Sequence, residues 1–206
     1  MDFKVTNLDG AYETLKSLNN LATTDGISGV TLASTLAGII NNLKAHWIGS
    51  DATLHINNLI KVYDALCALV TDVTTVAHNV SIPIVKAKEI REANGGAASD
   101  GTVIPVYDGS FEKISEVLTT EEYYVDPTAA PGDYRDLVGL SNDFNTFADK
   151  FAYYETELME NWTSGNDRAT AESSFTEFNG YVVKYKEYLS DAKDNLKTAT
   201  SNLSQL

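Results

Sequence analysis

The sequence has few of the features that cross-link a protein, hold it in a membrane or direct its export. Cys67 is the only cysteine among 206 residues, so no disulfide can form within the chain, and we expect it to be a small apolar residue on a helix. No stretch approaches the ~18 uninterrupted apolar residues of a membrane-spanning helix. The first ten residues lack the basic and apolar regions of a secretory signal peptide. We therefore expect a protein that is cytoplasmic or leaves the cell without a cleaved signal.

Positive charge is also scarce. The chain has 15 lysine and arginine residues against 29 aspartate and glutamate residues, a formal net charge of -14. Such a field repels phosphate backbones and anionic lipids, so we expect neither nucleic acid nor direct membrane binding. With 43% hydrophobic residues, the chain can bury a core as one elongated domain or as two small ones.

Residue patterns of known catalytic chemistry are missing as well. The three histidines, His46, His55 and His78, lack the spacing that places paired metal ligands on one helix face, and we expect them at the surface. There is no phosphate-binding glycine loop and no Gly-x-Ser-x-Gly motif. The sequence therefore predicts no catalytic residues, no metal site, no cofactor and no enzymatic activity.

What the sequence does have is a regular apolar period. Apolar side chains recur every three or four positions, as on the buried face of a long helix. The members before and after the first tryptophan are Leu32, Leu36, Ile40, Leu43, Trp47, Ala52, Ile56, Leu59, Tyr63, Leu66, Val70, Val73, Ala77 and Val80. Those around the second are Leu137, Leu140, Phe144, Phe147, Phe151, Tyr154, Leu158, Trp162, Ala171, Phe175, Phe178, Val182, Tyr185, Leu189, Ala192, Leu196, Ala199 and Leu203. The pattern predicts an all-α fold with helices near 27–47, 51–80, 134–162 and 167–203.

Both tryptophans are followed closely by glycine. Gly49 and Gly165 suit a tight reversal, because glycine adopts left-handed backbone angles without a steric penalty. We expect Trp47 and Trp162 to cover the two bends, which would make two antiparallel helical hairpins. The candidate caps of the helices that follow are Ser50 or Asp51 and Asn166 or Asp167.

The two halves resemble each other beyond the bends. The stretches VTNLDGAYETLKSLNN from Val5 and IPVYDGSFEKISEVLTT from Ile104 share Asp-Gly and an aliphatic pattern, and each is predicted to form a short leading helix. The predicted units are residues 1–93, a flexible linker at 94–102, and residues 103–206 with an insertion loop near 120–133. Pro83 is expected to kink or stop the second helix.

A helical hairpin of about a hundred residues with Trp-x-Gly at its bend resembles the WXG family of early secreted antigen-like proteins, substrates of bacterial type VII secretion. Residues 47–49, WIG, match this motif, and residues 162–165, WTSG, are one residue longer. Members of that family usually pair as dimers that form four-helix bundles. The resemblance therefore implies a tandem form, in which one chain is similar to a fused dimer.

The sequence departs from the family at its export signal. That signal is Tyr-x-x-x-Asp/Glu after the second helix, and neither hairpin is followed by it. Tyr153 has Glu157 at the right interval, but both precede Trp162. Three alternatives follow for the chain: it uses another signal, it travels with a partner, or it stays in the cytoplasm.

Three functions are consistent with these features. The favoured one is a non-enzymatic WXG-type protein that recognises secretion machinery or another WXG-type protein through its helix faces. The second is a structural or adaptor bundle without a link to secretion, in which the halves need not be equivalent. The third is an enzyme with an unrecognised site, for which the sequence has no positive feature and which an internal polar cavity would support. For the favoured function we expect an intrachain pseudo-dimer, with a domain-swapped homodimer as the alternative.

Overall fold

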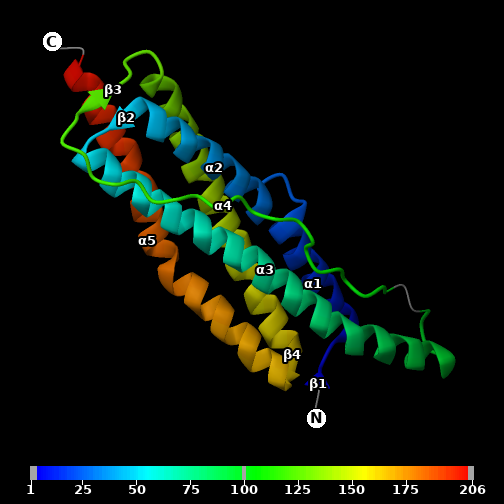
Figure 1. Ribbon diagram of the computed structural model, residues 1–206. Coiled ribbons are helices and arrows are strands. Elements are labelled where there is room, and N and C mark those ends of the chain that lie inside the picture. Colours follow the sequence, from blue (N-terminus) through cyan, green and yellow to red (C-terminus); the bar gives the residue numbers. More distant parts are fainter. Residues whose placement is uncertain (1–3, 99–100, 204–206) are drawn as a thin grey trace.

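A computed structural model describes residues 4–98 and 101–203, except for the side chains of residues 166, 167 and 203. The described helices are α1 (Leu8–Thr23), α2 (Gly29–His46), α3 (Ser50–Ala93), α4 (Ala130–Asn161) and α5 (Asn166–Leu203). Short strands lie between them: β1 (Lys4–Val5), β2 (Trp47–Ile48), β3 (Tyr124–Val125) and β4 (Trp162–Ser164) (Figure 1). The chain is thus largely helical, as predicted, and the four predicted long helices correspond to α2, α3, α4 and α5.

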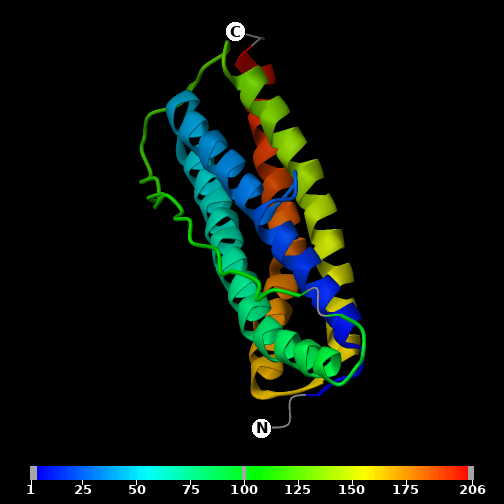
Figure 2. The ribbon, with the colours of Figure 1, turned by 90° about the vertical axis from the view of Figure 1, so that its right-hand side faces the viewer.

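The helices form an elongated bundle. α1 and α2 follow one another along its length, and both contact α3 and α4, while α5 contacts the same two helices (Figures 1 and 2). α3 returns antiparallel to α2, and α5 returns antiparallel to α4, because only a few residues join each pair. Buried apolar side chains from all five helices belong to one continuous cluster. The two hairpins therefore share a core.

The predicted apolar stripes supply most of that core. Aromatic side chains dominate where α4 meets α5: the rings of Phe151 and Phe175 meet edge to face at 5.4 Å, and those of Phe151 and Phe178 at 5.3 Å. Each fully buried large apolar side chain contributes roughly 1.5–3 kcal/mol relative to an exposed one. Packing of these stripes is the main stabilising force in the bundle.

A break of five residues, 24–28, separates α1 from α2. Ser28 caps α2 by accepting a hydrogen bond from the backbone N–H of Thr31 at 3.2 Å. Asp25 forms an ion pair with Lys150 of α4 at 3.0 Å, and this hydrogen bond lowers the pKa of its carboxyl group. The break is thereby fixed against the second hairpin.

Pro83 does not stop its helix, although a stop was one of the two predicted outcomes. α3 continues to Ala93, and its last turns run at an angle to the rest of the helix (Figure 2). These turns are held on α1 because Lys88, which is buried, forms an ion pair with Asp9 at 3.1 Å, and Arg91 forms another at 2.9 Å. Hydrogen bonds from Arg91 and Lys88 lower the pKa of Asp9 to about 2. Tertiary contacts thus outweigh the helix-breaking tendency of proline.

The prediction of a short leading helix from Ile104 is wrong. The first of the two similar stretches forms α1, whereas residues 101–123 form an extended segment that runs back along α3 (Figure 1). Ile104 and Ile114 of this segment are buried in the common core, and Leu118 is 85% exposed. The apolar spacing that suggested a helix reflects contacts of an extended chain instead. Within the predicted insertion loop, residues 124 and 125 form β3, and α4 begins at Ala130.

Candidate protein-interaction site

Both tryptophans lie at the bends, as expected from the sequence. Trp47 is 2% exposed and Trp162 is fully buried, and each ends its helix in an extended backbone conformation. Gly49 and Gly165 follow with φ of 137° and 140°, a region that disfavours residues with a Cβ atom. These four residues are therefore brought together in pairs, one pair at each end of the bundle.

The predicted side-chain cap of α3 is wrong. Gly49 occupies the cap position and has no side chain that could accept a hydrogen bond. Ser50 is already the first helical residue. The backbone amide of Thr53 donates to the Gly49 carbonyl at 2.9 Å. The alternatives for α5, Asn166 and Asp167, have side chains outside the described residues.

Each bend is held by a strand that precedes the opposite hairpin. β2 pairs antiparallel with β3, which places Trp47 opposite Val125, and β1 pairs antiparallel with β4, which places Val5 opposite Trp162. The residue after each strand adds a backbone hydrogen bond to the same bend. The Thr6 amide donates to the Asn161 carbonyl at 3.0 Å, and the Asp126 amide donates to the His46 carbonyl at 2.8 Å. The two ends of the molecule are built by the same exchange of segments between hairpins.

The histidines have structural contacts. The imidazole of His55 stacks on Trp47 with ring centroids 5.7 Å apart and planes 10° apart. His55 is buried, which corrects the expectation of surface histidines, and burial lowers the pKa of its imidazole. His46 Nδ1 lies 2.8 Å from a carboxylate oxygen of Asp133, and this contact links the end of α2 to the first turn of α4.

The extended segment is bound through its backbone. The side-chain amide of Asn57 donates to the Val117 carbonyl at 3.0 Å and accepts from the Val117 amide at 2.8 Å. The Tyr63 hydroxyl donates to the Glu112 carbonyl at 2.6 Å, and Lys44 donates to a further backbone carbonyl of the segment at 2.8 Å. Side chains of the first hairpin thus satisfy backbone groups that a helix would have paired internally.

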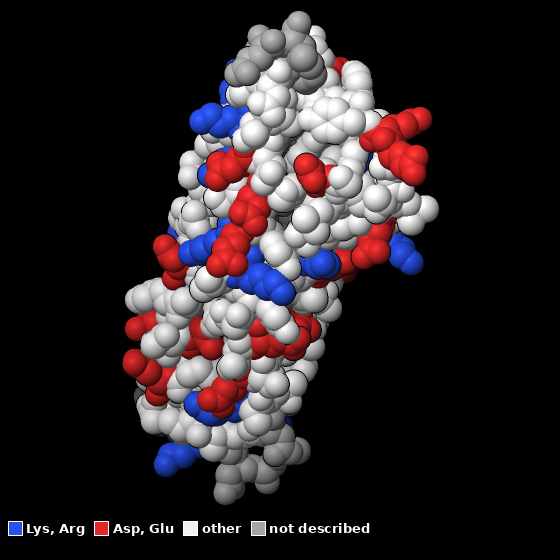
Figure 3. All heavy atoms as spheres, turned by 90° about the vertical axis from the view of Figure 1, so that its left-hand side faces the viewer, with Lys and Arg blue, Asp and Glu red and all other residues white. Residues whose placement is uncertain are grey.

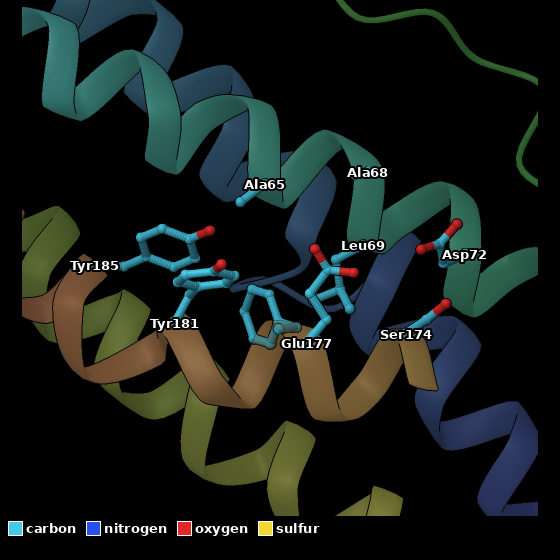
Figure 4. Close-up of a pocket in the computed structure, with 9 residues that line it drawn as sticks. Ala65, Ala68, Leu69, Asp72, Ser174, Glu177, Tyr181 and Tyr185 are labelled. Carbon is cyan, nitrogen blue, oxygen red and sulfur yellow. The ribbon is translucent and has the colours of Figure 1, made fainter. Parts of the chain in front are cut away.

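A pocket of about 180 Å³ opens between α3 and α5 (Figure 4). Tyr181 and Tyr185 form one end, with ring centroids 5.9 Å apart, and Asp72, Glu177 and Ser174 form the other. Ala65, Ala68, Leu69 and Phe178 complete its lining. The pocket therefore offers an aromatic surface next to two carboxylates.

The lining of this pocket contains two carboxylates, Asp72 and Glu177, and no lysine or arginine. Burial raises the pKa of Asp72, and the nearby charge of Glu177 raises it further, against the opposing effect of a hydrogen bond from Ser174. Burial also raises the pKa of Tyr185. A positive group would relieve the repulsion between the carboxylates while its apolar stem packed on the rings.

This pocket could not be predicted from the sequence. Tyr185 belongs to the predicted apolar stripe, Tyr181 and Glu177 lie outside it, and Asp72 lies more than a hundred residues earlier. Only the packing of α3 on α5 brings them together. In the described part of the chain, no group of three or more His, Cys, Asp or Glu side chains is arranged to hold a metal ion.

Comparison of the chain with models of protein families, with curated proteins and with solved structures found no match. Within the described residues, no helix combines the length and apolar character needed to cross a membrane.

Proposed function

We propose that this chain is a non-enzymatic WXG-type protein associated with bacterial type VII secretion, which acts by recognising other proteins through its helix faces. In this proposal two tandem antiparallel hairpins form a pseudo-dimeric four-helix bundle. Residues 1–93 and 103–206 are its two units, and residues 94–102 join them. The partner is secretion machinery or another WXG-type protein, and the chain is exported by the type VII route.

This proposal is supported by the pairing of each tryptophan bend with the strand that precedes the other hairpin. In both hairpins a short strand precedes the first helix and pairs with the bend of the other hairpin. From Lys4 to Trp47 there are 43 positions, and from Tyr124 to Trp162 there are 38. The difference of five equals the length of the break at residues 24–28. α1 and α2 together therefore correspond to α4, and α3 corresponds to α5.

This equivalence favours the proposal over an adaptor bundle without a link to secretion, because such a bundle does not require matching halves. The surface also suits recognition of proteins. Acidic side chains are spread along the face shown in Figure 3, and the pocket between α3 and α5 adds an aromatic surface. Such a combination selects basic partners by charge and anchors them by ring contacts.

Secretion itself is the test. The chain is tagged at its C-terminus in its source bacterium, and its amount in the culture medium is compared between a strain with the type VII membrane ATPase and a strain lacking it. We expect the chain in the medium only when the ATPase is present, with a cytoplasmic enzyme as the control for lysis. Retention inside cells that export their other type VII substrates would favour the adaptor bundle.

A further inference from the structure

The first hairpin shows how this architecture holds an extended peptide. Residues 107 and 110–112 line a groove together with Ala37 of α2 and Tyr63 of α3. The small side chain of Ala37 leaves room for the segment, and Tyr63 and Lys44 bind its backbone carbonyls. A hollow with polar groups at its rim is therefore a peptide-binding surface in this fold.

The second hairpin has a corresponding groove, lined only by α4 and α5, with a volume of about 520 Å³. Ala152 lies in this groove ten residues before Trp162, as Ala37 lies ten residues before Trp47. Asn179 lies fourteen residues after Gly165, and Tyr63 occupies the same position after Gly49. The two grooves are thus related by the correspondence between the hairpins.

The charges of the two grooves differ. Lys44 faces an extended segment that carries five acidic residues and one lysine. At the position of Lys44, three residues before the tryptophan, the second hairpin has Met159.

Three glutamates, Glu155, Glu160 and Glu172, line the open groove. Arg168 offsets part of this charge through its 2.7 Å ion pair with Glu172. Burial and the proximity of Glu172 raise the pKa of Glu155, which shows that its charge is poorly compensated despite a hydrogen bond from Asn179.

We propose that the groove between α4 and α5 binds an extended segment of a partner protein rich in lysine or arginine, in the way that the first groove holds residues 101–123. The extended segment of a second copy of this chain is excluded as the occupant, because its acidic residues would face the three glutamates. The proposal rests on the proposed function only in requiring a protein partner.

A labelled peptide tests the site directly. A fluorescein-labelled peptide of alternating lysine and threonine, about twelve residues long, favours an extended backbone and supplies the positive charge. Its dissociation constant is measured by fluorescence anisotropy at low salt on the full chain, on E155Q/E160Q and on A152F. We expect about fivefold or weaker binding for both variants, because one loses the charge of the groove and the other fills it.

Matched variants separate this groove from the rest of the acidic surface. E89Q/E187Q removes the same charge from exposed positions elsewhere, and A45F adds a phenylalanine ring at an exposed position of α2, outside the groove. We expect both to bind within about twofold of the original chain, and a peptide of residues 104–117 not to bind.

Equal loss in E89Q/E187Q would show a general charge effect and overturn the proposal. Equal loss in A45F and A152F, binding of the peptide of residues 104–117, or no binding of the basic peptide would also overturn it. Thermal unfolding of each variant verifies its fold. Because no secretion machinery takes part, failure here is distinguishable from failure of the proposed function.

Discussion

At the scale of single residues, the two tryptophans show how burial and backbone geometry act together. The indole N–H of Trp162 donates to the Ser164 carbonyl at 3.1 Å, and the Trp162 carbonyl accepts from Arg168 at 2.6 Å. The ring fills the core while the backbone on either side turns into the next helix. Trp162 is therefore a structural residue of the bend.

Replacement of Trp162 by alanine should lower the free energy of unfolding by about 3–5 kcal/mol, since it leaves a large cavity in the core. W162F retains an aromatic ring but loses the indole hydrogen bond, so we expect a smaller loss. Denaturant unfolding measures both. A ligand-binding role for the tryptophan would instead leave the stability of W162A unchanged while binding was lost.

His55 makes the other bend sensitive to acid. Burial against Trp47 lowers the pKa of its imidazole below the ordinary value of 6.5, with smaller opposing effects from Asp191 and Asp51. In the unfolded chain the imidazole takes up a proton near its ordinary pKa, whereas the folded chain resists it. The unfolded state therefore binds more protons in this window, and stability is lost as the pH falls below about 6.5.

The melting temperature of the original chain should accordingly fall between pH 7.5 and 5.5 by more than that of H55F, which keeps an aromatic ring on Trp47 without a titrating group. Scanning calorimetry at several pH values measures the difference. Identical pH profiles for the two proteins would show that His55 does not control stability in this range.

At the scale of elements, the extended segment is the main departure from the sequence prediction. Its stretch from Ile104 shares Asp-Gly and an aliphatic pattern with α1, yet it forms no helix. The deciding contacts come from Asn57 and Tyr63, which precede it in sequence by about fifty to sixty residues. Local patterns do not contain such contacts, so tertiary packing overrides them.

Removal of these side-chain anchors should release the extended segment while the helices remain. N57A loses both hydrogen bonds to Val117, and a net cost of about 1–2 kcal/mol is expected. Hydrogen exchange should accelerate at residues 112–117 but not in the middle of α4. N58A, which removes a neighbouring amide that accepts a hydrogen bond from Lys61, is the matched control. Unchanged exchange at these residues in N57A would contradict the assigned anchoring role.

At the scale of the whole molecule, the apolar period predicted the long helices because each stripe is buried continuously along its helix. The glycine and tryptophan positions predicted both bends for the same local reason. The reciprocal strands could not be predicted, since Val5 and Val125 meet partners far away in sequence and each strand has only two residues that pair with a bend. The pockets share this limitation because each is lined by residues of at least two elements that only the packing brings together.

The fused pseudo-dimer is the central claim, and cleavage of the connection between hairpins tests it most directly. A protease site is placed at residues 96–98, the full chain is folded and then cut, and the product is analysed by size-exclusion chromatography with light scattering. Because both hairpins share one core and clamp each other's bends, the two fragments should remain together at the mass of one chain, 22.4 kDa. Separation of the fragments under native conditions, or a mass of two chains before and after cleavage, would contradict a pseudo-dimer formed within one chain.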